Sequence, residues 1–152
     1  MTTKQKFSLF FLRVSLGVLM LYAGITKVVN PAWSAEGYIK GAKTFAWFYQ
    51  WLFNLNILPV INFLNEWGLM LLGISLIFGI FVRLSSSLGI VLMLLYYCAA
   101  LDFPYPDTYS FIVDQHVIYI GVLGLFIFFR AGRVWGLDRW ISNKFHRLQK
   151  FT

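Results

Sequence analysis

Apolar residues along this chain gather into four long runs separated by more polar segments. The runs cover residues 7–29, 63–82, 84–101 and 111–129, and each approaches the roughly 20 residues needed to cross a hydrocarbon core about 30 Å thick. Backbone amides inside lipid need partners within their own segment, so the runs predict helices. No run alternates with the period of a membrane barrel strand. We predict an all-α integral membrane protein, a bundle of four transmembrane helices in a single domain spanning residues 1–152.

The connection between the first two runs, residues 30–62, is aromatic rather than polar. Residues 33–42 fit a short surface helix, and residues 45–53 are rich in Phe, Trp and Tyr but too few to cross a bilayer. This composition is typical of an interfacial or re-entrant segment whose ring edges lie at the headgroup level. We expect Pro59 to end this segment and Asn62 to cap the second span.

The other two connections are short. Spans two and three are joined only around Arg83, which predicts an antiparallel hairpin. Residues 102–110 contain Pro104 and Pro106 and predict a rigid turn between spans three and four.

The composition supports lipid as the main solvent of this chain. Hydrophobic residues make up 59% of it and charged residues 12%, whereas a soluble domain usually has about 25% charged residues. The mean hydropathy is +0.70. Cys98 is the only cysteine, which excludes an intrachain disulfide, a CxxC redox pair and a cysteine zinc site.

Basic residues are concentrated at one end of the predicted helices, and the positive-inside rule places that end in the cytoplasm with both termini. The residues at that end are Lys4, Lys6, Arg83, Arg130, Arg133, Arg139, Lys144, Arg147 and Lys150. The opposite loops hold only Lys40 and Lys43. Residues 133–152 predict a basic amphipathic tail on the anionic inner leaflet. The net charge of +7 therefore indicates membrane orientation rather than binding to nucleic acid.

Two cations lie within the first span, where ionisable groups are costly and mark candidate sites. Arg13, Gly17, Met20, Gly24 and Lys27 follow a 4-3-4-3 spacing and share one stripe of the helix. Because small residues let another backbone approach closely, we expect this stripe to face the bundle interior. The alternative is that both cations snorkel to their nearest interfaces.

Several polar residues are predicted to converge near one membrane depth, at the outer helix ends. They are Lys27, Glu66, Cys98, Asp102, Asp114 and His116. Glu66 and Asp114 either carry protons or simply offset the helix dipole from first turns, an effect of about 0.3–1 kcal/mol. His116 is either a structural hydrogen-bonding residue or a proton donor, since histidine titrates nearest neutrality. It is the only histidine in or near a span, and no metal or haem site is predicted.

Cys98 has two interpretations. By default it is a small buried hydrophobe. As a sulfur relay it would need an activated thiolate, which requires Lys27 or His116 nearby.

Five motifs, in order along nearly the whole chain, resemble those of the DoxX/DoxD family. The first two are Arg13…Gly17…Tyr22-Ala23-Gly24…Lys27 and Asn30-Pro31-Ala32-Trp33-Ser34-Ala35-Glu36-Gly37. The others are Asn65-Glu66-Trp67-Gly68 with Gly73, Gly79 and Arg83, then Asp114-Gln115-His116-Val117-Ile118-Tyr119, then Ala131-Gly132-Arg133-Val134-Trp135-Gly136-Leu137-Asp138. The second motif leans towards the DoxD branch.

The resemblance implies a membrane subunit of thiosulfate:quinone oxidoreductase, in sulfur metabolism at the prokaryotic cytoplasmic (inner) membrane. Such a subunit couples oxidation of thiosulfate to tetrathionate with quinone reduction and works with a DoxA-like partner. Under this hypothesis Glu66, Asp114 and His116 are catalytic and supply protons. The substrate-binding residues are Lys27, which would attract thiosulfate, with Arg13, Tyr96, Tyr97 and Trp47.

A second hypothesis is a non-catalytic membrane scaffold for another enzyme, since the sequence shows no recognisable redox centre. A homo-oligomer is compatible with either function. Transport is disfavoured because no inverted repeat or pair of broken helices is visible.

Overall fold

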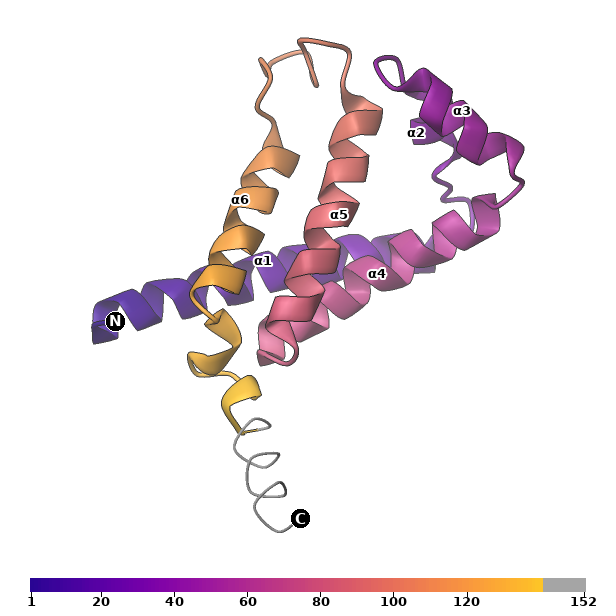
Figure 1. Cartoon of the computed structure of the whole chain (residues 1–152). Coiled ribbons are helices and arrows are strands. Elements are labelled where there is room, and N and C mark those ends of the chain that lie inside the picture. Colours follow the sequence, from indigo (N-terminus) through magenta and orange to yellow (C-terminus); the bar gives the residue numbers. More distant parts are fainter. Residues whose placement is uncertain (141–152) are drawn as a thin grey trace, which may run out of the picture.

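The computed structural model describes residues 1–140, and its regular elements are helical. Figure 1 shows α1 (Thr3–Val29), α2 (Glu36–Gly41), α3 (Ala46–Asn54), α4 (Leu58–Phe78), α5 (Val82–Ala100), α6 (Gln115–Phe128) and the 3-10 helix η1 (Ala131–Arg133). Helices α1, α4 and α5 are long and apolar enough to cross a membrane, as the hydrophobic pattern predicts.

Helix α6 differs from the predicted fourth span of residues 111–129. It is a largely apolar helix of 14 residues, which at 1.5 Å each give a length of about 21 Å. The helix begins only at Gln115 because Asp114 is extended and caps it, accepting hydrogen bonds from the backbone N–H groups of His116 and Val117. A fourth crossing is therefore not established by this helix alone.

Helices α1 and α4 form a tightly packed antiparallel pair (Figure 1). A Cβ atom added at Gly73 would lie 2.5 Å from the amide nitrogen of Leu21 and 2.7 Å from the carbonyl oxygen of Gly17. At Gly24 it would lie 2.7 Å from the amide nitrogen of Met70. The backbones can touch only because these positions carry no side chain, which is the packing mode of small residues in membrane helices. The predicted inward-facing stripe is confirmed for its glycines.

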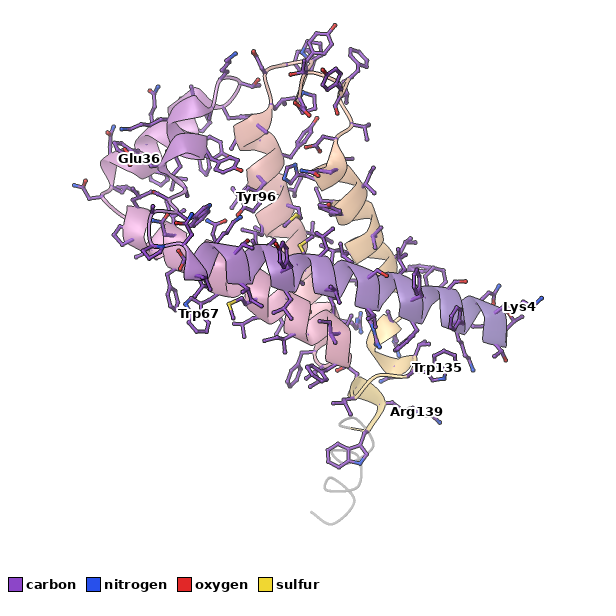
Figure 2. All side chains as sticks on the ribbon, turned by 180° about the vertical axis from the view of Figure 1, so that it is seen from behind. Lys4, Glu36, Trp67, Tyr96, Trp135 and Arg139 are labelled. Atoms are coloured by element: carbon purple, nitrogen blue, oxygen red, sulfur yellow. The ribbon has the colours of Figure 1, made fainter. Side chains whose placement is uncertain are left out.

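Helices α5 and α6 form a second antiparallel pair that crosses the first instead of running alongside it (Figures 1 and 2). The core lies at this crossing. Its most deeply buried apolar residues, each no more than 2% exposed, are Met20, Leu76, Val82, Met93, Leu123, Phe126 and Ala131.

The turn between α4 and α5 comprises residues 79–81 and lies earlier than predicted, since Arg83 is already in α5. Gly79 ends α4 with a φ of 69°, a left-handed conformation that glycine adopts without strain. The carboxylate of Asp138 returns to this turn and accepts hydrogen bonds from the N–H groups of Phe81 and Val82 at 2.6 and 3.2 Å. It thereby satisfies two of the orphan donors at the start of α5.

From this turn α4 and α5 diverge, and α2 and α3 lie between their far ends (Figure 1). A second apolar cluster holds them there, formed by Ala35, Ile39, Ala42, Tyr49 and Ala99. The aromatic segment of residues 45–53 is thus largely the helix α3, packed on α5. We call the end of the molecule that carries α2 and α3 the outer end.

Two predicted roles in this region are wrong. Helix α4 begins at Leu58, so Pro59 opens it rather than ending the preceding segment; proline fits a first turn because its missing N–H has no helical partner there. Asn62 consequently lies inside α4 and is not its cap. Its Oδ1 instead accepts a hydrogen bond from the N–H of Ala35, 2.9 Å away, and ties α4 to the start of α2.

The predicted basic tail of residues 133–152 is only partly described. Residues 133–138 fold back on the α4–α5 turn through hydrogen bonds from the N–H groups of Leu137 and Asp138 to the carbonyl oxygens of Phe78 and Gly79. The amphipathic helix expected beyond them falls mostly outside residues 1–140.

Candidate functional site

A cavity of about 310 Å³ lies at the outer end, between α2, α3, α4 and α5. Aliphatic side chains line most of it, and the aromatic and polar groups in its wall are Tyr38, Phe48, Tyr49, Asn65 and Tyr96. It therefore suits a mostly apolar molecule with a few hydrogen-bonding atoms, as ligand pockets usually do.

Tyr96, on the outer half of α5 (Figure 2), connects this cavity to α6. Its ring stacks on the imidazole of His116, with centroids 5.7 Å apart and planes 22° apart. It also meets the ring of Tyr38 edge-on at 5.8 Å. The Tyr96 hydroxyl is buried and has no hydrogen-bond partner within residues 1–140. Such a group costs about 1–3 kcal/mol and calls for an explanation.

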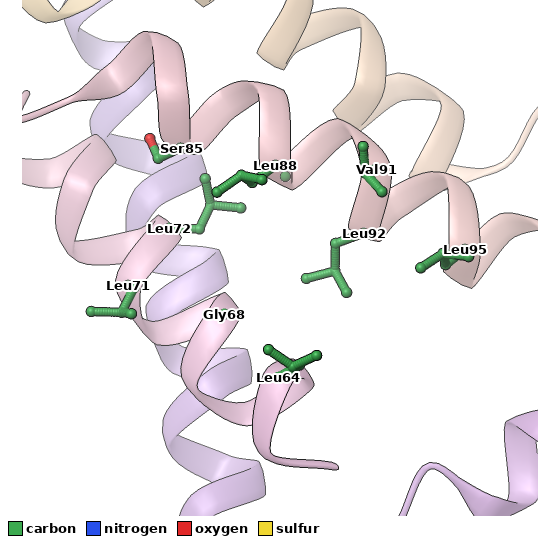
Figure 3. Close-up of a pocket in the computed structure, with 10 residues that line it drawn as sticks. Leu64, Gly68, Leu71, Leu72, Ser85, Leu88, Val91, Leu92 and Leu95 are labelled. Carbon is green, nitrogen blue, oxygen red and sulfur yellow. The ribbon is translucent and has the colours of Figure 1, made fainter. Parts of the chain in front are cut away.

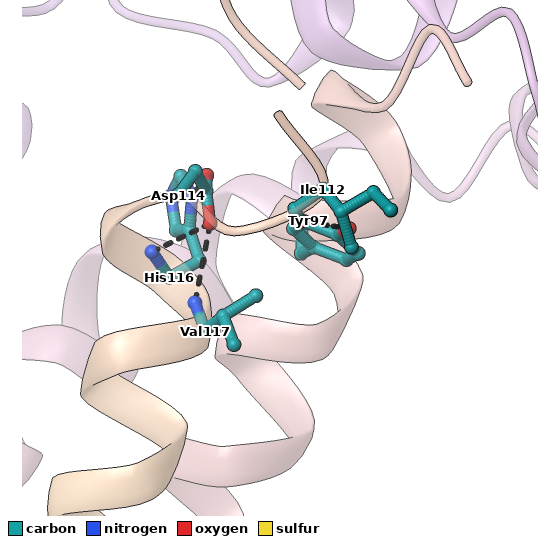
Figure 4. Close-up of polar contacts among 5 residues, drawn as sticks. All are labelled: Tyr97, Ile112, Asp114, His116 and Val117. Atoms are coloured by element: carbon teal, nitrogen blue, oxygen red, sulfur yellow. Dashed lines mark hydrogen bonds and ion pairs between the residues drawn. The ribbon is translucent and has the colours of Figure 1, made fainter. Parts of the chain in front are cut away.

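Asp114 and His116 form a compact pair at the start of α6, drawn in Figure 4. Oδ2 of Asp114 lies 2.5 Å from Nδ1 of His116, while Oδ1 accepts from the N–H groups of His116 and Val117 at 2.9 and 3.1 Å. Asp114 is 8% exposed. The carboxylate engages Nδ1, so Nε2 is the ring nitrogen that it does not contact. Asp114 thus caps the helix and also contacts the histidine ring, while its role in carrying protons stays a prediction.

Tyr49 anchors α3 beneath the cavity. Its hydroxyl donates a hydrogen bond to the carbonyl oxygen of Leu95 on α5, 2.6 Å away. Burial, with a smaller effect of the nearby Cys98, raises the pKa of Tyr49 to about 12. This phenol therefore stays protonated and acts as a fixed donor.

Two other predicted residues lie near the outer end but not in this pair. Lys27 is half-buried in the last turn of α1, with its ammonium 4.9 Å from the ring centroid of Trp33. Glu66 lies in the third turn of α4, not in a first turn, so it is not a cap. Its side chain is partly buried, and within the described part of the chain neither Glu66 nor Lys27 forms an ion pair.

The remaining outer candidates face elsewhere. Tyr97 donates its hydroxyl proton to the carbonyl oxygen of Ile112, 2.5 Å away. Trp47 is 72% exposed and does not line the cavity, whereas its neighbour Phe48 does. Cys98 packs against the cluster of α2 and α3. Asp102 forms an exposed ion pair with Lys43 at 2.6 Å. The predicted convergence therefore holds for Asp114 and His116 but not for the whole set.

Arg13 lies far along α1 from Lys27, within the core beside the α4–α5 turn. It is fully buried, and its guanidinium donates to the carbonyl oxygens of Ala131 and Trp135 at 2.8 and 3.4 Å. It does not snorkel to solvent. These contacts give it a structural role near residues 131–138, away from the outer cavity.

Three residues that line the cavity were not predicted from the sequence: Asn65, Tyr38 and Tyr49. Asn65 stands directly before Glu66 in a motif that resembles the family signature, which could have drawn attention to it. Its Nδ2 donates to the carbonyl oxygen of Ile61 at 2.8 Å. Tyr38 and Tyr49 carried no local signal beyond aromatic character, because their position depends on how α2 and α3 fold over α5.

Among the comparisons with known proteins, a family model described as DoxX matches residues 8–101 of the chain. No curated protein and no solved structure matches the chain. Among residues 1–140, no group of three or more His, Cys, Asp or Glu side chains is arranged to hold a metal ion.

Proposed function

The chain belongs to the DoxX family of membrane proteins, and from this premise we propose that it is a membrane subunit of a thiosulfate:quinone oxidoreductase. In this proposal quinone is reduced at the outer cavity, and a DoxA-like subunit completes the enzyme. The observation that carries the proposal is the stack of Tyr96 on His116, which links an apolar cavity to a carboxylate-oriented proton carrier.

Quinone reduction makes three demands on a protein. The ring needs an apolar slot, its carbonyl oxygens need hydrogen-bond donors, and two protons must arrive with two electrons. The cavity offers the slot. The buried, unpartnered hydroxyl of Tyr96 is a donor in its wall, and a quinone carbonyl would remove the cost of leaving that group unsatisfied.

The reaction balances as follows. Two thiosulfate ions lose two electrons and join through a new S–S bond to give tetrathionate. The quinone takes up those two electrons and two protons to become the quinol. We assign His116 as the carrier of one proton, held in orientation by Asp114. General acids work best when their pKa lies near the operating pH, and histidine is the residue type whose ordinary pKa lies closest to neutrality. Glu66 is our candidate for the second proton.

The membrane topology follows the same proposal. We infer four crossings, with α6 and the non-helical residues 111–114 before it as the fourth, and with both termini in the cytoplasm. Reporter domains fused to each end, read in intact cells and in opened cells, test this arrangement. If a reporter at either terminus were accessible in intact cells, that terminus would lie outside the cytoplasm and the inferred topology would be wrong.

The activity test measures thiosulfate-dependent reduction of a quinone analogue in membranes that contain the chain and its DoxA-like partner. We compare the intact chain with His116→Gln, Glu66→Gln and Tyr96→Phe at equal folded amounts. Tyr22→Phe is the matched control, since Tyr22 is 69% exposed on α1. We expect His116→Gln to lose at least tenfold in rate and the control to lose nothing. No reduction by the intact chain with its partner would remove the enzymatic proposal.

A scaffold function is the second candidate, and the exposed aromatic face of α3 favours it. Trp47 and Trp51 are 72% and 54% exposed, and tryptophans on a surface are common anchors at protein interfaces. If the chain only docks a partner enzyme, Trp47→Ala should weaken co-purification of that enzyme. Unchanged partner activity in a strain lacking the chain would argue against this function.

A further inference from the structure

A second hollow lies between the diverging helices α4 and α5. It has a volume of about 320 Å³ and is lined by leucines, glycines and a valine, with Ser85 near the turn (Figure 3). Leu71 and Leu88 on its rim are 60% and 64% exposed. In a bilayer, this groove opens directly onto hydrocarbon.

The groove and the outer cavity share part of their walls. Leu64 on α4 and Leu92 and Leu95 on α5 line both hollows. The two hollows are therefore neighbours that meet at these three leucines, with Tyr38, Asn65 and Tyr96 on the cavity side. The groove is lined almost entirely by aliphatic residues, whereas the cavity wall also holds aromatic and hydrogen-bonding groups.

We propose that the two adjacent hollows together take a quinone with a long isoprenoid tail, the ring in the aromatic cavity and the tail passing the shared leucines into the α4–α5 groove. The inference rests on the proposed function and names the class of its electron acceptor as a membrane-resident quinone. A tailed quinone matches the two hollows, because its more polar ring suits the cavity and its apolar tail suits the groove. A phospholipid would instead bring a charged headgroup to a cavity without a charged side chain in its wall.

The groove guides the tail more than it attracts it. Lipid chains are as apolar as leucine side chains, so moving the tail from bilayer to groove gains little free energy from water release. The groove instead provides a route that leaves the ring in the cavity. A side chain that fills the groove should therefore exclude tailed quinones by sterics and spare quinones without a tail.

Gly68 is the position at which to fill it. It lines the groove, and a Cβ atom there would meet only Leu92 Cδ2 at 3.9 Å, an ordinary contact. The Cβ of a new side chain at position 68 therefore makes no clash, and Gly68→Leu places further atoms in the groove and raises helix propensity. Gly121→Leu is the matched control. Gly121 is also a helical glycine, in α6, with no atom within 4 Å of an added Cβ, and it lines neither hollow.

The experiment measures the Kd of a long-tailed quinone and of a tail-less analogue for the full chain in lipid nanodiscs, by quenching of tryptophan fluorescence. We expect Gly68→Leu to raise the Kd of the tailed quinone at least tenfold, with the tail-less Kd unchanged and both values unchanged in Gly121→Leu. The tail path would be overturned if Gly68→Leu changed the Kd of both quinones equally or changed neither. It would also be overturned if Gly68→Leu lost co-purified phospholipid while quinone binding stayed unchanged.

The failure of the broader proposal has a different signature. An intact chain that binds neither quinone would overturn quinone reduction itself, and the tail path with it. An intact chain that binds and reduces both quinones, with Gly68→Leu doing so equally, overturns only the tail path.

Discussion

The guanidinium of Arg13 donates a hydrogen bond through Nη1 to the carbonyl oxygen of Ala131, 2.8 Å away and 118 positions later in the chain. A Cβ atom at either Gly79 or Gly136 would lie 2.5 Å from the same nitrogen, so the guanidinium is enclosed between two glycine backbones. Asp138 is near enough to act on this cation electrostatically. A buried charge is tolerated only with such partners, and here the partners hold residues 131–138 against the α4–α5 turn.

Asp138→Ala should be destabilising. It removes the acceptor of the Phe81 and Val82 N–H groups at the start of α5 and takes a negative charge away from Arg13. We expect a loss of about 1–3 kcal/mol, because a donor left without its acceptor costs about that much. Unfolding in mixed micelles measures it, with exposed Arg83→Met as a control expected to change stability by about 0.5 kcal/mol or less.

The coupling itself is testable with Arg13→Met, which keeps an apolar stem but removes the charge. If the two residues act together, the double variant should be less destabilised than the sum of the single variants. Strict additivity would mean that Asp138 serves only as the helix cap.

Gly73→Ala should loosen the contact between α1 and α4. The new methyl group would fall 2.5 Å from the Leu21 amide nitrogen, where only a backbone shift makes room. Overpacking of this kind typically costs about 1–3 kcal/mol. Gly124→Ala on α6 has nothing within 4 Å and should instead stabilise by up to about 1 kcal/mol. The measurement is the free energy of unfolding of both variants under identical conditions. Equal values would contradict the close packing of α1 against α4 at Gly73.

Much of this fold could be predicted from the chain because lipid imposes a simple length rule on apolar runs. Three of the four predicted runs are helices long enough to span. The boundaries were harder, since α4 absorbs Pro59 into its first turn and Asp114 delays the start of α6. The crossing of the two helix pairs had no local signal, because periodicity assigns a face to a helix but does not name its partner.

The candidate site was predictable where chemistry is local. Asp114 and His116 stand two positions apart at a helix start, so their pairing follows from capping geometry. Glu66 and its neighbour Asn65 show the limit, since adjacent helical positions point about 100° apart and only Asn65 lines the cavity. The stack of Tyr96 on His116 depends on the pairing of α5 with α6.

Tyr49 should make stability sensitive to alkali. Its pKa is raised to about 12 when folded, chiefly by burial, against a reference value of about 10. A raised folded pKa contributes stability that is complete below pH of about 10 and is lost as pH rises towards about 12. Phenolate absorbance follows the titration. Tyr49→Phe should remove this component of the alkaline loss, while losing about 0.5–1.5 kcal/mol at neutral pH for the missing hydrogen bond to Leu95.

Lys27 should govern capture of the thiosulfate anion under the proposed function. It is half-buried beside Trp33 and forms no ion pair within residues 1–140, so its charge is available to an anion. We expect Lys27→Gln to raise KM for thiosulfate several-fold and leave KM for quinone unchanged. Lys40→Gln is the control, because Lys40 is already paired with Glu36 at 2.5 Å. A rise in both KM values would point to misfolding of the outer end instead.

Asp114→Asn separates the capping role of this residue from its role beside His116. Asparagine is as good an N-cap as aspartate, so its Oδ1 can still accept from the N–H groups of His116 and Val117, and stability should change by about 0.5 kcal/mol or less. Its amide, however, presents N–H to the imidazole. Nδ1 of His116 must then accept, which moves the remaining ring proton to Nε2 and removes the negative charge beside the ring. We expect quinone reduction to fall at least tenfold with unfolding unchanged, whereas Asp107→Asn in the exposed loop should alter neither. Full activity in Asp114→Asn would reduce Asp114 to a helix cap and leave the proton carrier to be sought at Glu66.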